Sequence, residues 1–177
     1  MKEKVVVGLN GVIMNNFIIL TDTRQKSEEH IIKEFDKQGI LHIRTGLPSA
    51  DYMAVRYDNE KGFYLDYSIL IDTKKDIEEI ASNLCNSQNH QRILREIQKG
   101  KDLGAKQFVF LINGGKIKTI EDLQNWTSKR TKVKGSVLLK IFQTMRQKYN
   151  VRFIICPKSK MGETIIKLFS NNLPTNK

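Results

Sequence analysis

Short apolar runs that alternate with amphipathic segments constrain the fold of this chain more than any other feature. The runs are FIIL, SILI, FVFLI and RFIIC, which begin at residues 17, 68, 108 and 152. Apolar runs without polar alternation are typical of strands buried on both faces. Segments with the periodicity of helices separate them. The sequence therefore predicts an α/β fold, with a central mixed β-sheet flanked by helices.

Local signals indicate where the helices begin and end. We expect the first helix over 27–38, with Ser27 as its cap and Gly39 just after its end. A second helix is expected to begin near Asp76. Longer helices are expected at 88–105, 134–150 and 161–172.

Turn residues predict two hairpins. Asn10-Gly11 within the stretch 5–14 suits a tight turn. The strands 51–58 and 63–72 are expected to pair in antiparallel fashion about a turn near Lys61-Gly62.

The longest polar stretch, 113–135, is interpreted as a surface excursion and not as a domain boundary. We therefore expect residues 1–177 to form a single domain, with its core at about 17–170.

The charge balance indicates a polyanionic partner. Lys and Arg number 30 against 19 Asp and Glu, which gives a formal charge of +11 and a pI near 9.6. Nucleic acid or an anionic membrane would suit such a surface, although the charge could also serve solubility alone. No apolar stretch approaches the roughly 20 residues of a spanning helix, so we expect no membrane partner.

The cysteines and histidines do not suggest a structural metal site. Cys85 and Cys156 stand in apolar surroundings without a CxxC pairing, and we expect reduced core thiols in a cytoplasmic protein. The three histidines lack the spacing of zinc ligands.

Asp72 and Lys74 form an unusual end to an apolar strand. Since side chains alternate along a strand, Asp66, Ser68, Leu70, Asp72 and Lys74 are expected to share one face. Antiparallel pairing of 51–58 with 63–72 would place Asp51 beside Asp72. Two carboxylates and one lysine would then converge at one end of the sheet.

Two adjacent carboxylates repel each other unless a cation lies between them. Mg²⁺ binds one or two protein carboxylates and keeps waters for a substrate phosphate. A neighbouring lysine can position the attacking water or offset charge on the phosphate. This chemistry fits phosphodiester hydrolysis, but a bare D…DxK spacing is common and, taken alone, is more typical of an exposed hairpin with ordinary surface charges.

Two further pairs could join this site. Asp22 follows a strand and could add a carboxylate to the metal, and Arg24 could bind phosphate. A simple turn after the strand would explain the same residues. Arg92 and Glu96 lie four apart on one helix face, either as a surface pair or facing the same site.

Five blocks in order resemble the XPF-type nuclease domain of the PD-(D/E)XK superfamily. They are LTDTRQ, GLPSADY, ILIDTKKDIEEI, HQRILREIQKGKDLGAKQFVFLI and RFIICPKSKMGETI, and they cover about 17–169. The Asp-x-Arg motif of the family falls on Asp22 and Arg24. Its Gly-Asp-Tyr motif falls on 50–52 and its Glu-Arg-Lys motif on 72–74.

The resemblance implies a restriction-endonuclease-like core that cleaves DNA with Mg²⁺ or Mn²⁺, using Asp22, Asp51, Asp72 and Lys74. The implied metal ligands are Asp51, Asp72 and Asp22. Flaps, forks or other branched joints would be the substrates, in DNA repair, recombination or replication. Family members usually work as dimers, so a homodimer or a protein partner is expected.

Three residues depart from the family pattern. Ala50 replaces a glycine, which suits the position only if its φ is negative. Asp72 replaces a glutamate and shortens the reach to a metal by one methylene. Thr73 replaces an arginine and removes one cation near the phosphate.

The resemblance covers a nuclease domain without helix-hairpin-helix modules. DNA contacts would then come from Arg24, Arg92 and the basic run Lys129, Arg130, Lys132 and Lys134, or from a partner. The run could also be a solvated loop.

Three hypotheses follow from the sequence. The first is a Mg²⁺-dependent DNA endonuclease. The alternative is a catalytically weak or inactive DNA-binding module of the same fold, which the departures at Asp72 and Thr73 favour. An RNA-binding or RNA-processing protein fits the charge equally well, but the chain lacks an aromatic strand motif of single-strand RNA binders.

Overall fold

A mixed sheet forms the centre of the molecule. The computed structural model describes residues 17–25, 28–58 and 60–171. The six strands of the sheet lie in the order β2-β1-β3-β4-β5-β6. Their bounds are Phe17–Asp22 for β1, His42–Thr45 for β2, Tyr52–Asp58 for β3, Gly62–Lys74 for β4, Gln107–Asn113 for β5 and Val151–Cys156 for β6.

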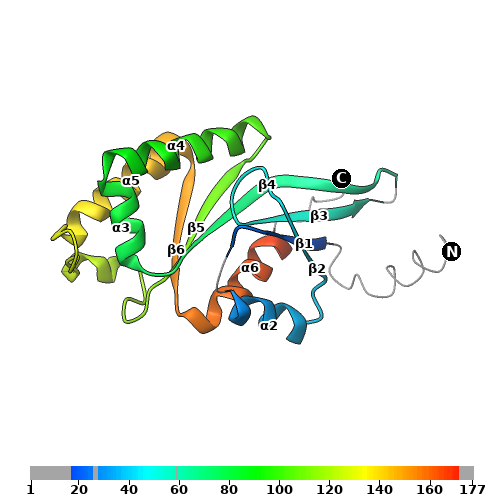
Figure 1. The fold of residues 1–177 in the computed structure, drawn as a ribbon, viewed down its shortest axis with the longest axis horizontal. Coiled ribbons are helices and arrows are strands. Elements are labelled where there is room, and N and C mark those ends of the chain that lie inside the picture. The colour runs from blue at the N-terminus through cyan, green and yellow to red at the C-terminus, as the bar shows by residue number, and fades with distance from the viewer. Residues whose placement is uncertain (1–16, 26–27, 59, 172–177) are drawn as a thin grey trace.

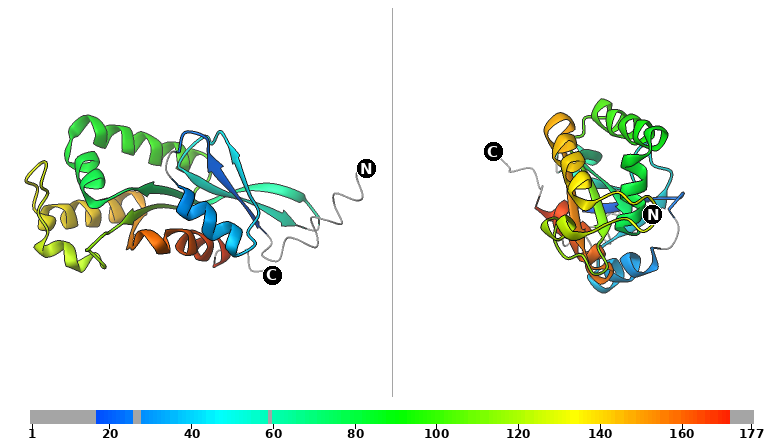
Figure 2. Two further views of the ribbon diagram at one scale, coloured as in Figure 1. Left: turned by 60° about the horizontal axis from the view of Figure 1, so that its bottom comes forward. Right: turned by 90° about the vertical axis from the view of Figure 1, so that its left-hand side faces the viewer.

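Helices cover both faces of the sheet (Figures 1 and 2). One face carries α3 (Ile77–Cys85), α4 (Ser87–Asp102) and α5 (Gly135–Tyr149) over Leu70, Phe108 and Phe110. The other face carries α2 (Glu29–Lys37) and α6 (Met161–Ser170) over Ile71 and Val109. The predicted α/β class is therefore confirmed, and the continuous apolar runs are explained by burial on both sides.

Most helix limits agree with the local signals. The Asp76 carboxylate caps α3 by accepting a hydrogen bond from the Glu79 backbone N–H at 2.7 Å. Gly39 follows α2 with a φ of 65°, a conformation that costs glycine little. Glu28 occupies the cap position of α2 without a side-chain cap, and the expected cap Ser27 lies outside the described residues. The hairpin expected at 5–14 lies outside them too.

An irregularity in the β3–β4 hairpin determines where the polar residues point. Ala54 pairs with Asp66, yet Tyr52 pairs with Ile71, so five residues of β4 advance against two of β3. Because the excess of three is odd, it reverses the faces of β4 beyond the bulge. Asp66 bonds Arg56, which reaches the α6 side, whereas Leu70 packs under α4. The expectation that Asp66 shares a face with Asp72 is therefore wrong.

The connection at 113–135 is attached to the body, although most of it is exposed. It contains a short 3₁₀ helix, Glu121–Asn125, whose Leu123 is fully buried. An isolated bridge joins Thr127 to Lys134 and closes a small loop.

No helix in the described part of the chain is long and apolar enough to cross a membrane. Both cysteines are free thiols, with Cys156 buried and Cys85 half-buried.

Candidate active site

A pocket of ≈ 230 Å³ opens beside α4, where β1 and β4 end and β3 begins. The sequence-predicted residues that line it are Asp22, Arg24, Asp51, Asp72, Lys74 and Arg92. Glu96 and Ala50 also contribute to its wall. The structure therefore brings together the whole predicted constellation except the basic run at 129–134.

Asp51 reaches the pocket because of the bulge. Continued without it, the ladder would bring Asp51 opposite Ile69 and not beside Asp72. Instead the Asp51 backbone N–H donates to the Ile71 carbonyl at 2.9 Å. Its Oδ2 accepts from the Thr73 backbone N–H at 2.7 Å and from the Thr73 hydroxyl at 2.8 Å. Burial, and then the Asp72 carboxylate, raise the pKa of Asp51 to about 7.

Ala50 holds the backbone of this segment in an unusual conformation. Its φ is 60°, in the left-handed region that favours glycine. The negative φ that would accommodate an alanine here is therefore not observed. Strained backbone next to a carboxylate is typical of functional sites.

Lys74 and Asp72 form a close ion pair inside the pocket. The lysine side chain is only 11% exposed, and its ammonium lies 5.4 Å from the centre of the Phe110 ring. Burial opposes the charged form, but Asp72 and then Asp51 outweigh it and raise the pKa of Lys74. The ion pair therefore favours the protonated form of Lys74.

Asp22 is committed to Arg24 and to the loop after β2. Its Oδ1 accepts from the Arg24 backbone N–H at 2.7 Å and from Nε at 2.8 Å. Its Oδ2 accepts from Nη2 of Arg24 at 2.7 Å and from the Leu47 backbone N–H at 2.9 Å. The side-chain hydrogen bond from Arg24 is the largest cause that lowers the pKa of Asp22 to about 2.

These bonds use the lone pairs of both Asp22 oxygens. They favour a role in which Asp22 positions Arg24, whose side chain is 68% exposed at the pocket. The assignment of Asp22 to a metal stays a prediction.

Arg92 and Glu96 both face the pocket from α4, in line with one of the two alternatives drawn from their spacing. Arg92 donates to the Asn83 side-chain oxygen at 3.4 Å. Glu96 accepts from the Ser49 hydroxyl at 3.4 Å. No ion pair joins Arg92 to Glu96 within the described ranges.

The basic run lies outside the pocket. Lys129, Arg130, Lys132 and Lys134 are exposed in the loop closed by the Thr127–Lys134 bridge. Glu78 at the start of α3 holds this loop by accepting from the Ser128 hydroxyl at 2.6 Å and the Lys129 backbone N–H at 2.7 Å. Since α3 directly follows β4, the loop is attached at the same end of the sheet as the pocket.

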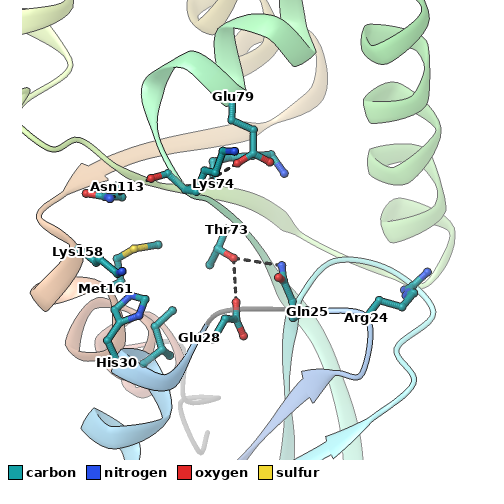
Figure 3. A pocket seen from close by; sticks show the side chains of 12 residues that line it. Arg24, Gln25, Glu28, His30, Thr73, Lys74, Glu79, Asn113, Lys158 and Met161 are labelled. Atoms are coloured by element: carbon teal, nitrogen blue, oxygen red, sulfur yellow. Dashed lines mark hydrogen bonds between the residues drawn. The ribbon is translucent and has the colours of Figure 1, made fainter.

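A second pocket, of ≈ 420 Å³, adjoins the first and shares Arg24, Gln25 and Lys74 with it (Figure 3). Thr73 lines it together with Glu28 and His30. Sequence reasoning noted Thr73 only as a missing cation and passed over Glu28. No motif could have revealed Glu28, because it precedes a helix far from β4 in the sequence.

The donor set suits a cation that keeps most of its waters. Within the described ranges, no three His, Cys, Asp or Glu side chains could hold a metal together. The hydrogen bonds of Asp51 go to Oδ2 and the ion pair of Asp72 goes to Oδ1. One oxygen of each carboxylate therefore remains for a ligand, which is the protein contribution that Mg²⁺ commonly accepts.

Comparison with known proteins decides the family. The family model described as the ERCC4 domain matches residues 21–169. The chain belongs to the ERCC4 domain family. This is a nuclease domain of the PD-(D/E)XK type, so the resemblance drawn from the motifs is confirmed. A search among curated proteins found no match.

Solved structures show the same fold. XPF from Aeropyrum pernix matches with a TM-score of 0.60 at 13% identity, over 88% of this chain and 66% of that chain. The same protein in complex with DNA matches with a TM-score of 0.51 at 14% identity, over 86% of this chain and 62% of that chain. This ERCC4 domain thus spans less than two thirds of either relative's length, and at such identity the likeness concerns the fold.

Proposed function

We propose that this ERCC4 domain is a Mg²⁺- or Mn²⁺-dependent DNA endonuclease that hydrolyses phosphodiester bonds. The observation that carries the proposal is the convergence of Asp51, Asp72 and Lys74 in one open pocket. The family assignment raises its weight, because the ERCC4 domain is a nuclease domain. Residues 1–177 as a single nuclease domain remain part of the proposal.

Asp51 and Asp72 would hold the cation, each through the oxygen that is not engaged by Thr73 or Lys74. Bound there, a divalent cation supplies polarisation of the scissile phosphate and a more acidic water. Asp22 is the third proposed ligand, although its hydrogen bonds to Arg24 and Leu47 favour a positioning role.

The cations of the chain would act on the phosphate. Hydrolysis joins a water oxygen to phosphorus and breaks the bond from phosphorus to the leaving sugar oxygen. Lys74 would offset the negative charge that builds on the phosphate in the transition state, since it stays protonated. Arg24, fixed by the two side-chain hydrogen bonds that it donates to Asp22, would present a planar guanidinium to a phosphate at the mouth of the pocket.

Phosphate contacts would dominate DNA binding. The charge of +11, Arg92 in the pocket and the basic run at 129–134 support this view. We propose branched DNA, such as flaps and forks in repair, recombination or replication, as the substrate. A homodimer or protein partner would extend the contact surface.

One observation favours the alternative of a weak or inactive DNA-binding module. Asp72 is already neutralised by Lys74, and its side chain is shorter than the glutamate of the family. A site closed by this ion pair would bind DNA without cutting it.

Nicking assays separate the two functions. Duplex, flap, fork and four-way DNA would be incubated with Mg²⁺, with Mn²⁺ and with a chelator, and an RNA duplex would test the third hypothesis. We expect cleavage of branched DNA that the chelator abolishes. Binding without cleavage under all metal conditions would favour the inactive module.

Metal binding gives an independent readout. Calorimetric titration with Mn²⁺ should show one site. Asp51→Asn and Asp72→Asn should each lower its Mn²⁺ affinity by about tenfold or more. Asp102→Asn is the matched control, because Asp102 is an exposed carboxylate at the end of α4. Unchanged Mn²⁺ affinity in both site variants would contradict the proposed ligands.

A further inference from the structure

Thr73 lines the larger pocket, and its hydroxyl has three polar neighbours although it carries only one proton. Its Oγ1 lies 2.8 Å from Asp51 Oδ2, 3.1 Å from Glu28 Oε1 and 3.3 Å from Gln25 Nε2 (Figure 3 shows the last two). A threonine hydroxyl has one proton and two lone pairs. Two of these three neighbours are carboxyl groups, so one of the two contacts requires a second proton.

The distances indicate how the protons are shared. The contact to Asp51 is the shorter one, and Asp51 must be a charged carboxylate when it holds a cation, so in that state the Thr73 proton points to Asp51. The Gln25 amide donates to one lone pair of Thr73. The other lone pair faces Glu28 Oε1, and two oxygens at 3.1 Å repel unless one carries a proton.

We propose that Glu28 is a positioning residue that acts in its neutral form, donating to Thr73 so that Thr73 donates to the metal ligand Asp51. This inference rests on the proposed function, since it assigns Asp51 to the cation. Thr73, which stands where the family has an arginine, then has a positioning role of its own. Its hydroxyl and its backbone N–H both donate to Asp51 Oδ2. Asp51 Oδ1 is then oriented toward the pocket.

The surroundings of Glu28 support the neutral form. Its carboxyl is half-buried and faces the buried phenol of Tyr52 on β3. Burial is the largest cause that raises the pKa of Glu28, and Asp72 on β4 adds to the rise. The hydrogen-bonding contacts with Tyr52 and Thr73, and then the charge of Arg44 on β2, act in the opposite sense, but burial outweighs them and the pKa of Glu28 is raised overall.

Glu28→Gln and Glu28→Ala test the proton directly. Glutamine keeps the shape of a neutral glutamic acid, and its amide can donate to Thr73. We therefore expect Glu28→Gln to keep the Mn²⁺ affinity of the parent within about twofold, and Glu28→Ala to weaken it by about tenfold. Glu29→Ala is the matched control, because Glu29 is the exposed neighbour on the same turn.

Variants of Thr73 test the connection. Thr73→Ser should retain Mn²⁺ affinity and cleavage, whereas Thr73→Val should lose about as much as Glu28→Ala, on the order of tenfold. Because both act through one path, the double variant Glu28→Ala with Thr73→Val should bind no more weakly than Thr73→Val alone. Thermal unfolding without metal shows that each variant is folded at the assay temperature.

The outcomes separate this inference from the proposed function. Equal loss in Glu28→Gln and Glu28→Ala would mean that a charged Glu28 is needed, which would overturn the inference. Parent-like Mn²⁺ affinity in Glu28→Ala would overturn it as well. If Asp51→Asn also leaves Mn²⁺ binding unchanged, both proposals fail. If Asp51→Asn weakens binding and Glu28→Ala does not, only the inference fails.

Discussion

The two ends of strand β4 differ in packing although they belong to one hairpin. At the outer end, Gly62 to Asp66 pair regularly with β3, and Phe63 and Leu65 are 47% and 49% exposed. At the inner end, Ile69 to Ile71 are buried and the ladder is interrupted by the bulge. The outer half is paired with β3, whereas the inner half also pairs with β5 and is covered by helices on both faces. The bulge therefore separates the outer half of β4, which carries no proposed site residue, from the inner half, which carries Asp72 and Lys74.

One ion pair lies at each end of the hairpin, and the two pairs differ in their surroundings. Arg56 at the outer end is 2% exposed and donates to Asp66 and to the Phe169 carbonyl, so the pair is closed and structural. Lys74 at the inner end bonds Asp72 beside a second carboxylate, Asp51, and the group opens into a pocket. An excess of negative charge in an open site is what distinguishes a cation-binding arrangement from a structural ion pair.

Truncation of two leucines in this strand tests the packing contrast most strongly. Leu70 is fully buried under α4, and Leu70→Ala should lower the free energy of unfolding by about 3 kcal/mol. Leu65→Ala at the exposed end should cost about 0.5 kcal/mol or less. Urea unfolding of the two variants measures both values. Equal costs would show that the two halves are packed alike.

Removal of Arg56 tests the closed ion pair. Arg56→Ala removes a buried side chain and leaves the half-buried Asp66 without its ion-pair partner, which should cost about 3 kcal/mol of stability. The double variant Arg56→Met with Asp66→Leu should recover most of this loss, because no charge is left behind. Cleavage below the melting temperature should not change in either variant. A fall in the cleavage rate would link the outer end to the site.

The same pair should respond to acid. Burial raises the pKa of Asp66, but hydrogen bonds from Ser68 and Arg56 outweigh it, so the pKa is lowered overall. A lowered folded-state pKa contributes stability above the unfolded pKa of about 3.9, and this stability is lost as pH falls through the folded value. Asp66→Asn should therefore lose less stability than the parent when unfolding is measured below about pH 4.

Replacement of Lys74 tests the open pair. Lys74→Ala should lower the cleavage rate by about a hundredfold while DNA affinity changes little, since the cation acts on charge that develops in the transition state. Lys74→Ala also removes the ion pair with Asp72, so rates are compared well below the melting temperatures of both proteins. Lys61→Ala is the control, because Lys61 is exposed in the turn at the outer end. Parent-like cleavage by Lys74→Ala would reject the catalytic assignment.

Sequence reasoning succeeded where one local rule governs a residue. Asp76 was expected at a helix start and caps α3, and the continuous apolar runs became buried strands. The motif residues Asp22, Arg24, Asp51, Asp72 and Lys74 do meet in one pocket. Their convergence was expected from antiparallel pairing of 51–58 with 63–72, although the bulge is also needed, because the outer ladder continued without it would place Asp51 opposite Ile69.

The bulge could not be anticipated from a two-residue repeat. Strand periodicity placed Asp66 with Asp72, but three extra residues in β4 reverse the face between them. Likewise, the contact between Glu28 and Thr73 depends on how α2 packs against the sheet, which no local pattern encodes. Tertiary packing therefore decided the part of the site that the sequence did not reveal.

The smallest effect is expected for Ala50→Gly, which tests the backbone strain at Ala50, the residue before Asp51. A φ of 60° places the Ala50 Cβ too close to its own backbone, at a cost of about 1–2 kcal/mol that glycine avoids. Glycine in turn loses one buried methyl group, worth about 0.8 kcal/mol, and more chain entropy on folding. We therefore expect Ala50→Gly to stabilise by about 0.5 kcal/mol or less in urea unfolding. Ala54→Gly is the matched control, because Ala54 is also buried in this segment but does not have a positive φ, and the change should cost about 1 kcal/mol or more. If the two variants lose the same free energy of unfolding, Ala50 does not have the left-handed conformation, and the claim of backbone strain before Asp51 is wrong.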